Sequence, residues 1–173
     1  RHGDISSRRD PSLETKVTKN YSLKTPFISS NMDTVTESEM ALAMANRGGL
    51  GILHRFMNPN EQVSQVKKIR EGLSKMDHPL PLAASIGVKE DGKLRADLLA
   101  DVGVEILTID IAHGDSVMML EILDHVKKKY PKVDIIAGNV ATPDATKRLI
   151  EHGADAVKVG IGPGSMCTTR IIT

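Results

Sequence analysis

The end of the chain carries residue types that fit anion binding and nucleophilic chemistry. An apolar run, 156–161, leads into the sequence Gly-Pro-Gly-Ser-Met-Cys-Thr-Thr-Arg. Glycine lets a ligand approach the backbone closely and leaves N–H groups that can point at an anion. We therefore expect Gly160, Gly162 and Gly164 to form a phosphate cradle, with the hydroxyl of Ser165 as a further donor.

The single cysteine of the chain, Cys167, lies three residues beyond the last of these glycines. A thiolate at this position can attack a substrate whose phosphate is held by the cradle. The same pattern also fits a glycine-rich connection followed by a small buried residue, because an isolated cysteine usually packs as a small apolar side chain. The residues alone leave both interpretations open.

Composition limits the classes of partner. The 173 residues are 40% hydrophobic and 26% charged, which is ordinary for one globular domain with its own core. A net charge of +1 creates no strong attraction to nucleic acid or to a membrane surface. Two tyrosines, two phenylalanines and no tryptophan are too few for a base-stacking platform. We expect neither nucleic acid nor membrane as a partner.

The number and spacing of cysteines and histidines bear on the cellular compartment and on metal binding. One cysteine excludes an internal disulfide and fits a reducing, cytoplasmic location. The sequence shows no secretory signal and no apolar run of membrane-spanning length. The six histidines lack the spacing of a zinc site, so no transition-metal centre is expected.

Apolar runs alternate with segments of helical periodicity from residue 26 onward. The predicted strands are 27–30, 50–53, 80–86, 106–112, 133–137 and 156–161, with a further short strand within 17–23. The predicted helices are 39–46, 61–73, 94–100, 118–129 and 143–151. Ser38 is the expected N-cap of the first helix, and Asn58-Pro59 opens the second.

This alternation predicts parallel βα units. They recur roughly every 25 to 30 residues, which suits a TIM (β/α)8 barrel of about 250 residues, and the chain supplies about the first six units. A doubly wound sheet is the structural alternative. We favour the barrel because its strands would bring polar residues at their carboxyl ends to one rim. These residues are Ser30, Asn31, Asp33, Asp110, Asn139, Ser165 and Cys167.

Four segments, in order along the chain, resemble the inosine monophosphate dehydrogenase and guanosine monophosphate reductase family. They are 30–37 (Ser-Asn-Met-Asp-Thr-Val-Thr-Glu), 110–114 (Asp-Ile-Ala-His-Gly), 137–142 (Ala-Gly-Asn-Val-Ala-Thr) and 159–170. The resemblance covers nearly the whole chain. It implies a TIM barrel that handles purine nucleoside monophosphates with a nicotinamide cofactor.

The resemblance also implies a reaction. Cys167 would attack C2 of the purine, the adduct would pass a hydride to NAD, and water would release xanthosine monophosphate from the remaining thioimidate. Loop N–H groups and Arg170 are expected to favour the thiolate. Thr169 would orient water or substrate beside the cysteine.

The binding residues follow from the same match. Implied substrate contacts are Ser30, Met32, Gly164 and Ser165, and implied cofactor contacts are Asp110, Asn139, Gly160 and Gly162. A potassium ion would take the backbone carbonyls of Gly162, Gly164 and Cys167. From the residues alone, Asp110 also fits a loop or helix cap and Asn139 a turn, and these interpretations stay open. Asp33 and Lys158 are expected to be structural, as a charged pair near the rim or a phosphate-side contact.

Two other functions remain as alternatives to the dehydrogenase. A guanosine monophosphate reductase would form the same adduct, expel ammonia and use NADPH. A non-catalytic nucleotide-binding protein would keep only the cradle. We favour the dehydrogenase because segments 32–37 and 168–173 resemble the usual dehydrogenase sequences more closely.

The expected domain is a partial barrel over residues 1–173 that ends inside the catalytic loop. Dehydrogenases of this family usually carry a regulatory insert after the second strand, and the chain shows none there. Either the protein is a member without the insert, or the insert was removed. The reductase also lacks it, so its absence favours the reductase alternative. The last two strands and the mobile flap would lie outside the chain. The family resemblance further implies a homotetramer.

Overall fold

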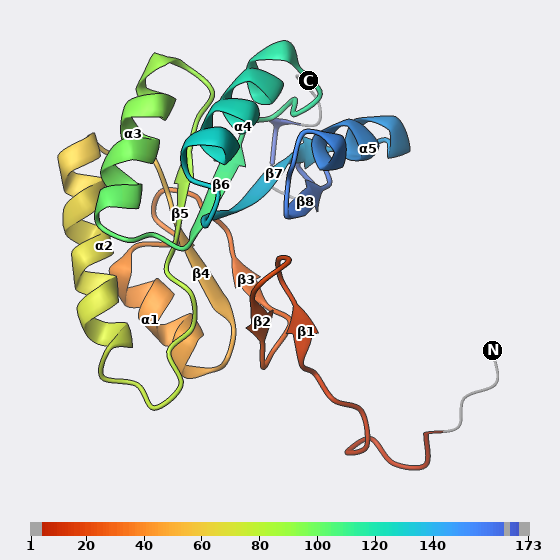
Figure 1. The fold of residues 1–173 in the computed structure, drawn as a ribbon. Coiled ribbons are helices and arrows are strands. Elements are labelled where there is room, and N and C mark those ends of the chain that lie inside the picture. Colours follow the sequence, from red (N-terminus) through yellow and green to blue (C-terminus); the bar gives the residue numbers. More distant parts are fainter. Residues whose placement is uncertain (1–4, 165–166, 170–173) are drawn as a thin grey trace.

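The computed structural model describes residues 5–164 and 167–169 (Figure 1). The strands are β1 Thr15–Lys16, β2 Ser22–Leu23, β3 Ile28–Ser29, β4 Leu50–Leu53, β5 Ala83–Ile86, β6 Ile106–Asp110, β7 Asp134–Val140 and β8 Ala156–Val159. The helices are α1 Ser38–Asn46, α2 Pro59–Leu73, α3 Glu90–Asp101, α4 Val117–Lys129 and α5 Pro143–Glu151. In the part of the chain described, no helix combines the length and apolar character needed to cross a membrane.

Six parallel strands form one sheet in the order β3-β4-β5-β6-β7-β8. Each strand pairs with the next one in the chain, and a helix lies between them (Figure 1). A doubly wound sheet would reverse its strand order at a switch point, whereas a TIM barrel adds strands in sequence order. The sheet curls with its helices on the outer side, so it is a partial TIM barrel of about six βα units.

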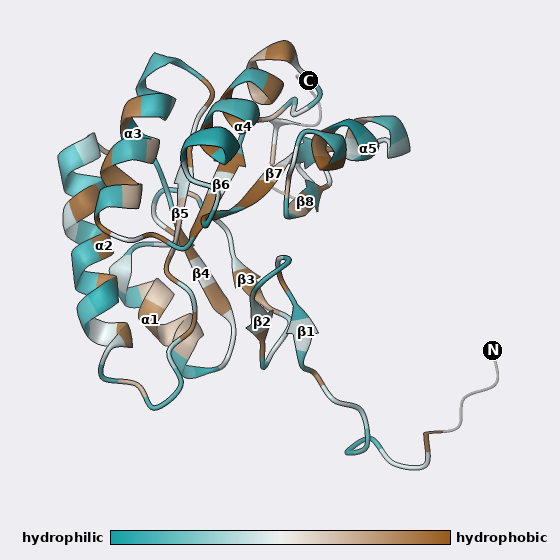
Figure 2. Ribbon diagram, viewed as in Figure 1, coloured by the Kyte–Doolittle hydropathy of each residue, from teal (hydrophilic) through white to brown (hydrophobic). Residues whose placement is uncertain are grey.

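The two faces of the sheet bury different partners, because side chains alternate along a strand. On β6, Leu107 and Ile109 join the large cluster that includes the apolar residues of all five helices. Ile106 belongs instead to a smaller cluster on the inner face, around Leu23 of the β1–β2 hairpin. Figure 2 shows brown segments along the strands and alternating teal and brown segments along the helices, as expected for helices with one buried side. Helices therefore cover one face only, as in a barrel.

The β1–β2 hairpin covers the amino-terminal end of the inner face. Leu23 is fully buried there, and Thr18 and Asn20 bind the carboxylate of Asp134, the first residue of β7. Asp134 accepts from the Thr18 hydroxyl at 2.6 Å and from the Asn20 backbone and side-chain nitrogens at 3.0 and 2.7 Å. A buried carboxylate with three donors is well compensated, so the hairpin fastens firmly to the sheet.

The two outer strands, β3 and β8, each pair on one side only within the described residues. A groove of about 660 Å³ lies beside β8, between Val159 and the α5 residues Thr146 and Ile150. A second groove of about 420 Å³ lies beside the loop after β3 and α1, and Met40 lines it. Exposed Val159, Ile150 and Met40 give both margins an apolar character, which fits a sheet that continues with further units.

The predicted element order is confirmed, with α5 and β4 at the predicted bounds. Within 17–23 only β2, Ser22–Leu23, is a strand, and the residues before it connect β1 to β2 in a hairpin. Helix α3 starts at Glu90 rather than residue 94. Strand β7 runs to Val140, past the predicted end at 137, because Gly138 pairs with Asp110 and Lys158 rather than turning.

The N-cap prediction for Ser38 is also wrong. Glu37 is the N-cap residue of α1, and its side chain makes no cap hydrogen bond. The backbone N–H of Ser38 instead donates to the side-chain oxygen of Gln65, on α2, at 3.2 Å. A neighbouring helix therefore supplies the cap that sequence reasoning assigns to a local hydroxyl.

Candidate functional site

An ion pair lies inside the carboxyl end of the sheet. The register places Asp110 of β6, Gly138 of β7 and Lys158 of β8 side by side, so the two charged residues flank the glycine. Lys158 Nζ donates to Asp110 Oδ1 at 2.7 Å. A Cβ on Gly138 would lie 2.6 Å from both the Cβ and the carbonyl oxygen of Lys158, so only glycine fits between them.

Lys158 also reaches the first exit loop. Its Nζ donates to Oδ1 of Asn31 at 3.2 Å, although the two residues are far apart in sequence. Lys158 is therefore part of a charged pair near the rim, as one of the two interpretations of the sequence held. Its partner, however, is Asp110 and not Asp33, the residue named with it from the sequence. Asp110, Asn31 and Lys158 form a polar layer, which we call the rim triad.

Several buried polar atoms in this half of the sheet have no hydrogen-bond partner among the described residues. They are Asn31 Nδ2, Arg55 Nε, Thr108 Oγ1 and Asn139 Oδ1. Buried polar atoms are almost always paired, and unpaired ones call for a physical explanation such as an absent ligand. Asn31 and Arg55 lie just beyond the ends of β3 and β4, and Asn139 lies near the end of β7. Thr108 lies two positions before Asp110.

The glycine loop follows β8 directly. Gly160 and Gly162 both have positive φ angles, 118° and 54°, which favour glycine. The N–H of Gly160 donates to the carbonyl of Val140 at 2.8 Å and so extends the sheet; it is not available to an anion as the cradle prediction requires. A Cβ on Gly164 would meet no atom within 4 Å, so open space lies above that residue.

Cys167 is partly exposed, and its backbone N–H donates to the carbonyl of Gly164 at 3.1 Å. This turn brings the cysteine back toward the glycine loop. Thr169 is also partly exposed. Ser165 and Arg170, which the sequence assigned to the phosphate and to thiolate formation, lie outside the described residues.

The loop after β6 packs tightly on β7. The N–H of Gly114 donates to the carbonyl of Asn139 at 2.7 Å, and a Cβ on Gly114 would lie 2.7 Å from that oxygen. Asp115, next in the loop, pairs with Arg148 of α5. Hydrogen bonds from the Arg148 guanidinium hold the pKa of Asp115 below its ordinary value. Asn139 lies within β7 rather than in the loop predicted from the sequence, and its backbone anchors the neighbouring loop.

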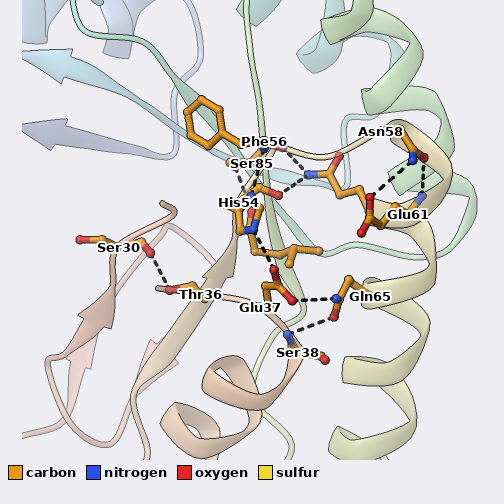
Figure 3. A network of polar contacts seen from close by, with 12 residues as sticks. Ser30, Thr36, Glu37, Ser38, His54, Phe56, Asn58, Glu61, Gln65 and Ser85 are labelled. Carbon is orange, nitrogen blue, oxygen red and sulfur yellow. Dashed lines mark hydrogen bonds and ion pairs between the residues drawn. The ribbon is translucent and has the colours of Figure 1, made fainter. Parts of the chain in front are cut away.

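The loop after β3 carries the expected nucleotide contacts, Ser30 and Met32. Met32 is 54% exposed, and the hydroxyl of buried Thr36 donates to the Ser30 carbonyl. Figure 3 shows a polar network behind this loop, in which His54 contacts Glu37 and Glu37 contacts Gln65. Sequence reasoning did not identify these three residues, because nothing in their spacing shows that two loops and a helix meet.

No group of three or more histidine, cysteine, aspartate or glutamate side chains is arranged to hold a metal ion, as far as the described residues go. A potassium site of the expected kind would use backbone carbonyls instead. The Gly164 carbonyl accepts one hydrogen bond from Cys167, and a carbonyl oxygen has a second lone pair. The Gly164 carbonyl therefore keeps a lone pair that such an ion could use.

The sequence of this chain is similar to those of several known proteins. The chain is 42% identical over 201 residues to an inosine-5'-monophosphate dehydrogenase of Cryptosporidium parvum, covering 95% of this chain and 50% of that protein. It is 38% identical over 205 residues to a protein of the same name from Borreliella burgdorferi, covering 93% and 51%. One from Staphylococcus aureus is 29% identical over 285 residues, covering 95% and 58%. The chain thus spans about half the length of the curated relatives it matches.

A family model for the IMP dehydrogenase / GMP reductase domain matches residues 2–173. The match covers the whole sheet, the rim triad and the glycine loop with Cys167. The chain therefore belongs to the IMP dehydrogenase / GMP reductase family.

Proposed function

We propose that the protein containing this chain is an NAD-dependent inosine monophosphate dehydrogenase. The observation that carries the proposal is the pairing of two features on β8. The strand holds Lys158 of the rim triad, and its exit loop holds the partly exposed Cys167. A nucleophile and a charged binding layer thus share one rim, where TIM-barrel enzymes have their active sites.

The chemistry assigned to Cys167 is covalent. Its thiolate adds to C2 of the purine, which makes that carbon tetrahedral and allows a hydride to leave. The chemistry that NAD would supply when bound is that of a hydride acceptor. Water then adds to the thioimidate carbon and the cysteine sulfur leaves, which yields xanthosine monophosphate and restores the thiol. Thr169, two residues along, is proposed to orient water or substrate.

The rim triad suits a nucleotide cofactor. Asp110 can accept hydrogen bonds from ribose hydroxyls, as acidic residues do in other dinucleotide sites. Its bond to Lys158 compensates part of its charge, so the carboxylate does not simply repel an anionic ligand. Asn31 Nδ2 and Asn139 Oδ1 offer a donor and an acceptor that lack protein partners among the described residues.

The phosphate of the mononucleotide is assigned to the glycine loop and the first exit loop. Gly164 has open space above it, while Ser30 and Met32 lie on the loop after β3. Because the Gly160 N–H is committed to the sheet, the proposal gives the phosphate to residues after Gly160. The carbonyls of Gly162, Gly164 and Cys167 are proposed to hold potassium, which prefers oxygen ligands.

The absence of a regulatory insert does not favour the reductase alternative. The alignments with the C. parvum and B. burgdorferi proteins run over 201 and 205 positions, against 285 for the S. aureus protein. Proteins named as dehydrogenases thus differ widely in how much extra sequence the matched region holds. A short connection between β4 and β5 therefore does not favour a reductase.

One absorbance assay on the full-length protein tests the proposal. We expect inosine monophosphate with NAD to produce NADH, and guanosine monophosphate with NADPH to leave NADPH unconsumed. The reverse pattern would identify a reductase. Nucleotide binding without either reaction would identify the non-catalytic alternative.

A further inference from the structure

The two ends of the loop that joins β3 to α1 are tied together by hydrogen bonds. The Thr36 hydroxyl donates to the carbonyl of Ser30 at 2.5 Å, which ties the end of the loop to its start. The backbone N–H groups of Val35 and Thr36 both donate to the carbonyl of Met32, at 3.2 Å. A displacement of Thr36 or its neighbour Glu37 is therefore transmitted to Ser30 and Met32.

His54, the residue after β4, contacts two successive residues of this loop. Its backbone N–H donates to the Thr36 carbonyl at 3.3 Å, and its ring Nε2 lies 3.4 Å from Oε1 of Glu37. The ring Nδ1 accepts from the backbone N–H of Phe56 at 3.0 Å. Because Nδ1 is an acceptor, the proton of a neutral ring is on Nε2, which then donates to Glu37. Figure 3 shows the imidazole between the two loops.

Glu37 departs from the usual behaviour of its position. An N-cap side chain normally accepts from the first turn of its own helix, yet Glu37 makes no such bond. Its two oxygens instead meet His54 and the side-chain nitrogen of Gln65, the latter at 3.0 Å. Gln65 in turn accepts from the Ser38 N–H and so caps the helix. Local rules tend to be broken at functional sites, where a side chain serves another purpose.

We propose that His54 and Glu37 are positioning residues that set the β3–α1 loop for binding the mononucleotide. This role rests on the proposed function, which assigns Ser30 and Met32 to the nucleotide pocket. The imidazole joins the loop after β4 to the loop after β3, and Glu37 passes that constraint to α2 through Gln65. The pair touches neither reacting atoms nor cofactor, so its effect is on substrate affinity.

Three variants of the full-length protein separate the contacts. Glu37→Ala removes the acceptor, and Glu37 is 53% exposed, so the variant should fold. His54→Asn keeps an oxygen near the position of Nδ1 for the Phe56 N–H but is too short to reach Glu37. His54→Gln places a donor near the position of Nε2 and so restores the contact with Glu37. Glu61→Ala is the matched control, because this carboxylate contacts Asn58 at the start of α2.

Steady-state kinetics provide the first measurement. We expect Glu37→Ala and His54→Asn to raise KM for inosine monophosphate about three- to tenfold, which corresponds to the net contribution of one ordinary hydrogen bond. Both kcat and KM for NAD should stay within about twofold, since the contact is uniform in ground and transition states. His54→Gln and Glu61→Ala should resemble the wild type. The double variant should be no worse than the poorer single one, because the pair acts as a unit.

Direct binding provides the second measurement. Calorimetric titration of inosine monophosphate into Glu37→Ala and His54→Asn, each in a Cys167→Ser background, should show the same loss of affinity, whereas His54→Gln and Glu61→Ala should not. An unchanged affinity in both Glu37→Ala and His54→Asn would overturn the positioning role. So would equal losses in kcat and in the KM values of both substrates, which would mean general damage to the fold. A wild type that binds the nucleotide but turns over neither substrate pair would instead overturn the proposed chemistry and leave the positioning result standing.

Discussion

The two ends of the curled sheet treat buried polar groups in opposite ways. At the amino end, Asp134 is 1% exposed and accepts three hydrogen bonds from Thr18 and Asn20. Toward the carboxyl end, four buried side-chain atoms have no partner among the described residues. Fully satisfied networks stabilise a fold, whereas unpaired groups cost free energy unless a ligand or water binds them. The amino end is therefore organised for stability and the carboxyl end for binding.

The largest expected effect is at the carboxyl end. Cys167→Ser in the full-length protein should abolish turnover of inosine monophosphate, because a serine hydroxyl is a far weaker nucleophile at neutral pH. Binding of the nucleotide should remain within a few-fold, since the glycine loop and Ser30 are unchanged. Stopped-flow absorbance and calorimetry measure the two quantities. A variant with near-normal turnover would show that catalysis does not use this cysteine covalently.

The next effect is at the amino end and concerns stability. Asp134→Ala removes the acceptor for the buried Thr18 hydroxyl and for two donors of the exposed Asn20, which should lower the free energy of unfolding by about 2 kcal/mol. Urea unfolding monitored by circular dichroism measures the change. Below the unfolding transition, KM for the nucleotide should be unchanged. A loss of affinity without a loss of stability would erase the distinction between the two ends.

A smaller effect of opposite sign is expected one layer below the rim triad. Thr108 is fully buried, and its hydroxyl has no partner among the described residues. Thr108→Val keeps the side-chain shape and removes that hydroxyl, so it should raise the free energy of unfolding by about 1 kcal/mol. The same urea titration measures it. A destabilised variant would mean that the hydroxyl is satisfied in the folded protein.

The smallest effect lies on the outer helices, away from both ends. Asp97 accepts from Lys129 Nζ at 2.8 Å and from the Tyr130 hydroxyl at 2.7 Å. These hydrogen bonds, that of Lys129 first, lower the pKa of Asp97 below its ordinary value of 3.8. A lowered pKa means stabilisation that is present above the ordinary value and lost as the pH falls through the lowered one.

Thermal unfolding of the wild type and of Asp97→Asn should therefore differ slightly but constantly near neutral pH. The difference should shrink as the pH falls below about 3.8. Because both charged groups are partly exposed, salt should also reduce it. A difference that grows in acid would contradict the assigned direction of the pKa.

Elements with strong local signals could be predicted from the sequence. Asn58-Pro59 and Thr142-Pro143 begin α2 and α5, and the side chains of both Asn58 and Thr142 accept a cap hydrogen bond. Their side chains and the fixed φ of proline act within a few residues, so no tertiary information is needed. The start of α3 has no such signal, since its N-cap residue, Lys89, makes no side-chain bond.

Features that depend on register or on packing between elements could not be predicted. Glycine is common in turns, and the predicted strand therefore ended before Gly138. In the structure Gly138 lies within β7, because Lys158 packs against it. The pairing of Lys158 with Asp110 requires the register of three strands. The contact of His54 with Glu37 requires two exit loops to meet. The candidate residues at strand ends were recognisable in sequence, whereas their partners were not.

The hairpin at the amino end bears on the side from which a ligand can approach. β1 and β2 lie over the amino-terminal end of the inner face, where Leu23 packs among buried residues of the sheet. The interior of a TIM barrel is a packed core and not a channel. Any ligand of the rim triad would therefore have to come and go on the carboxyl side of the sheet.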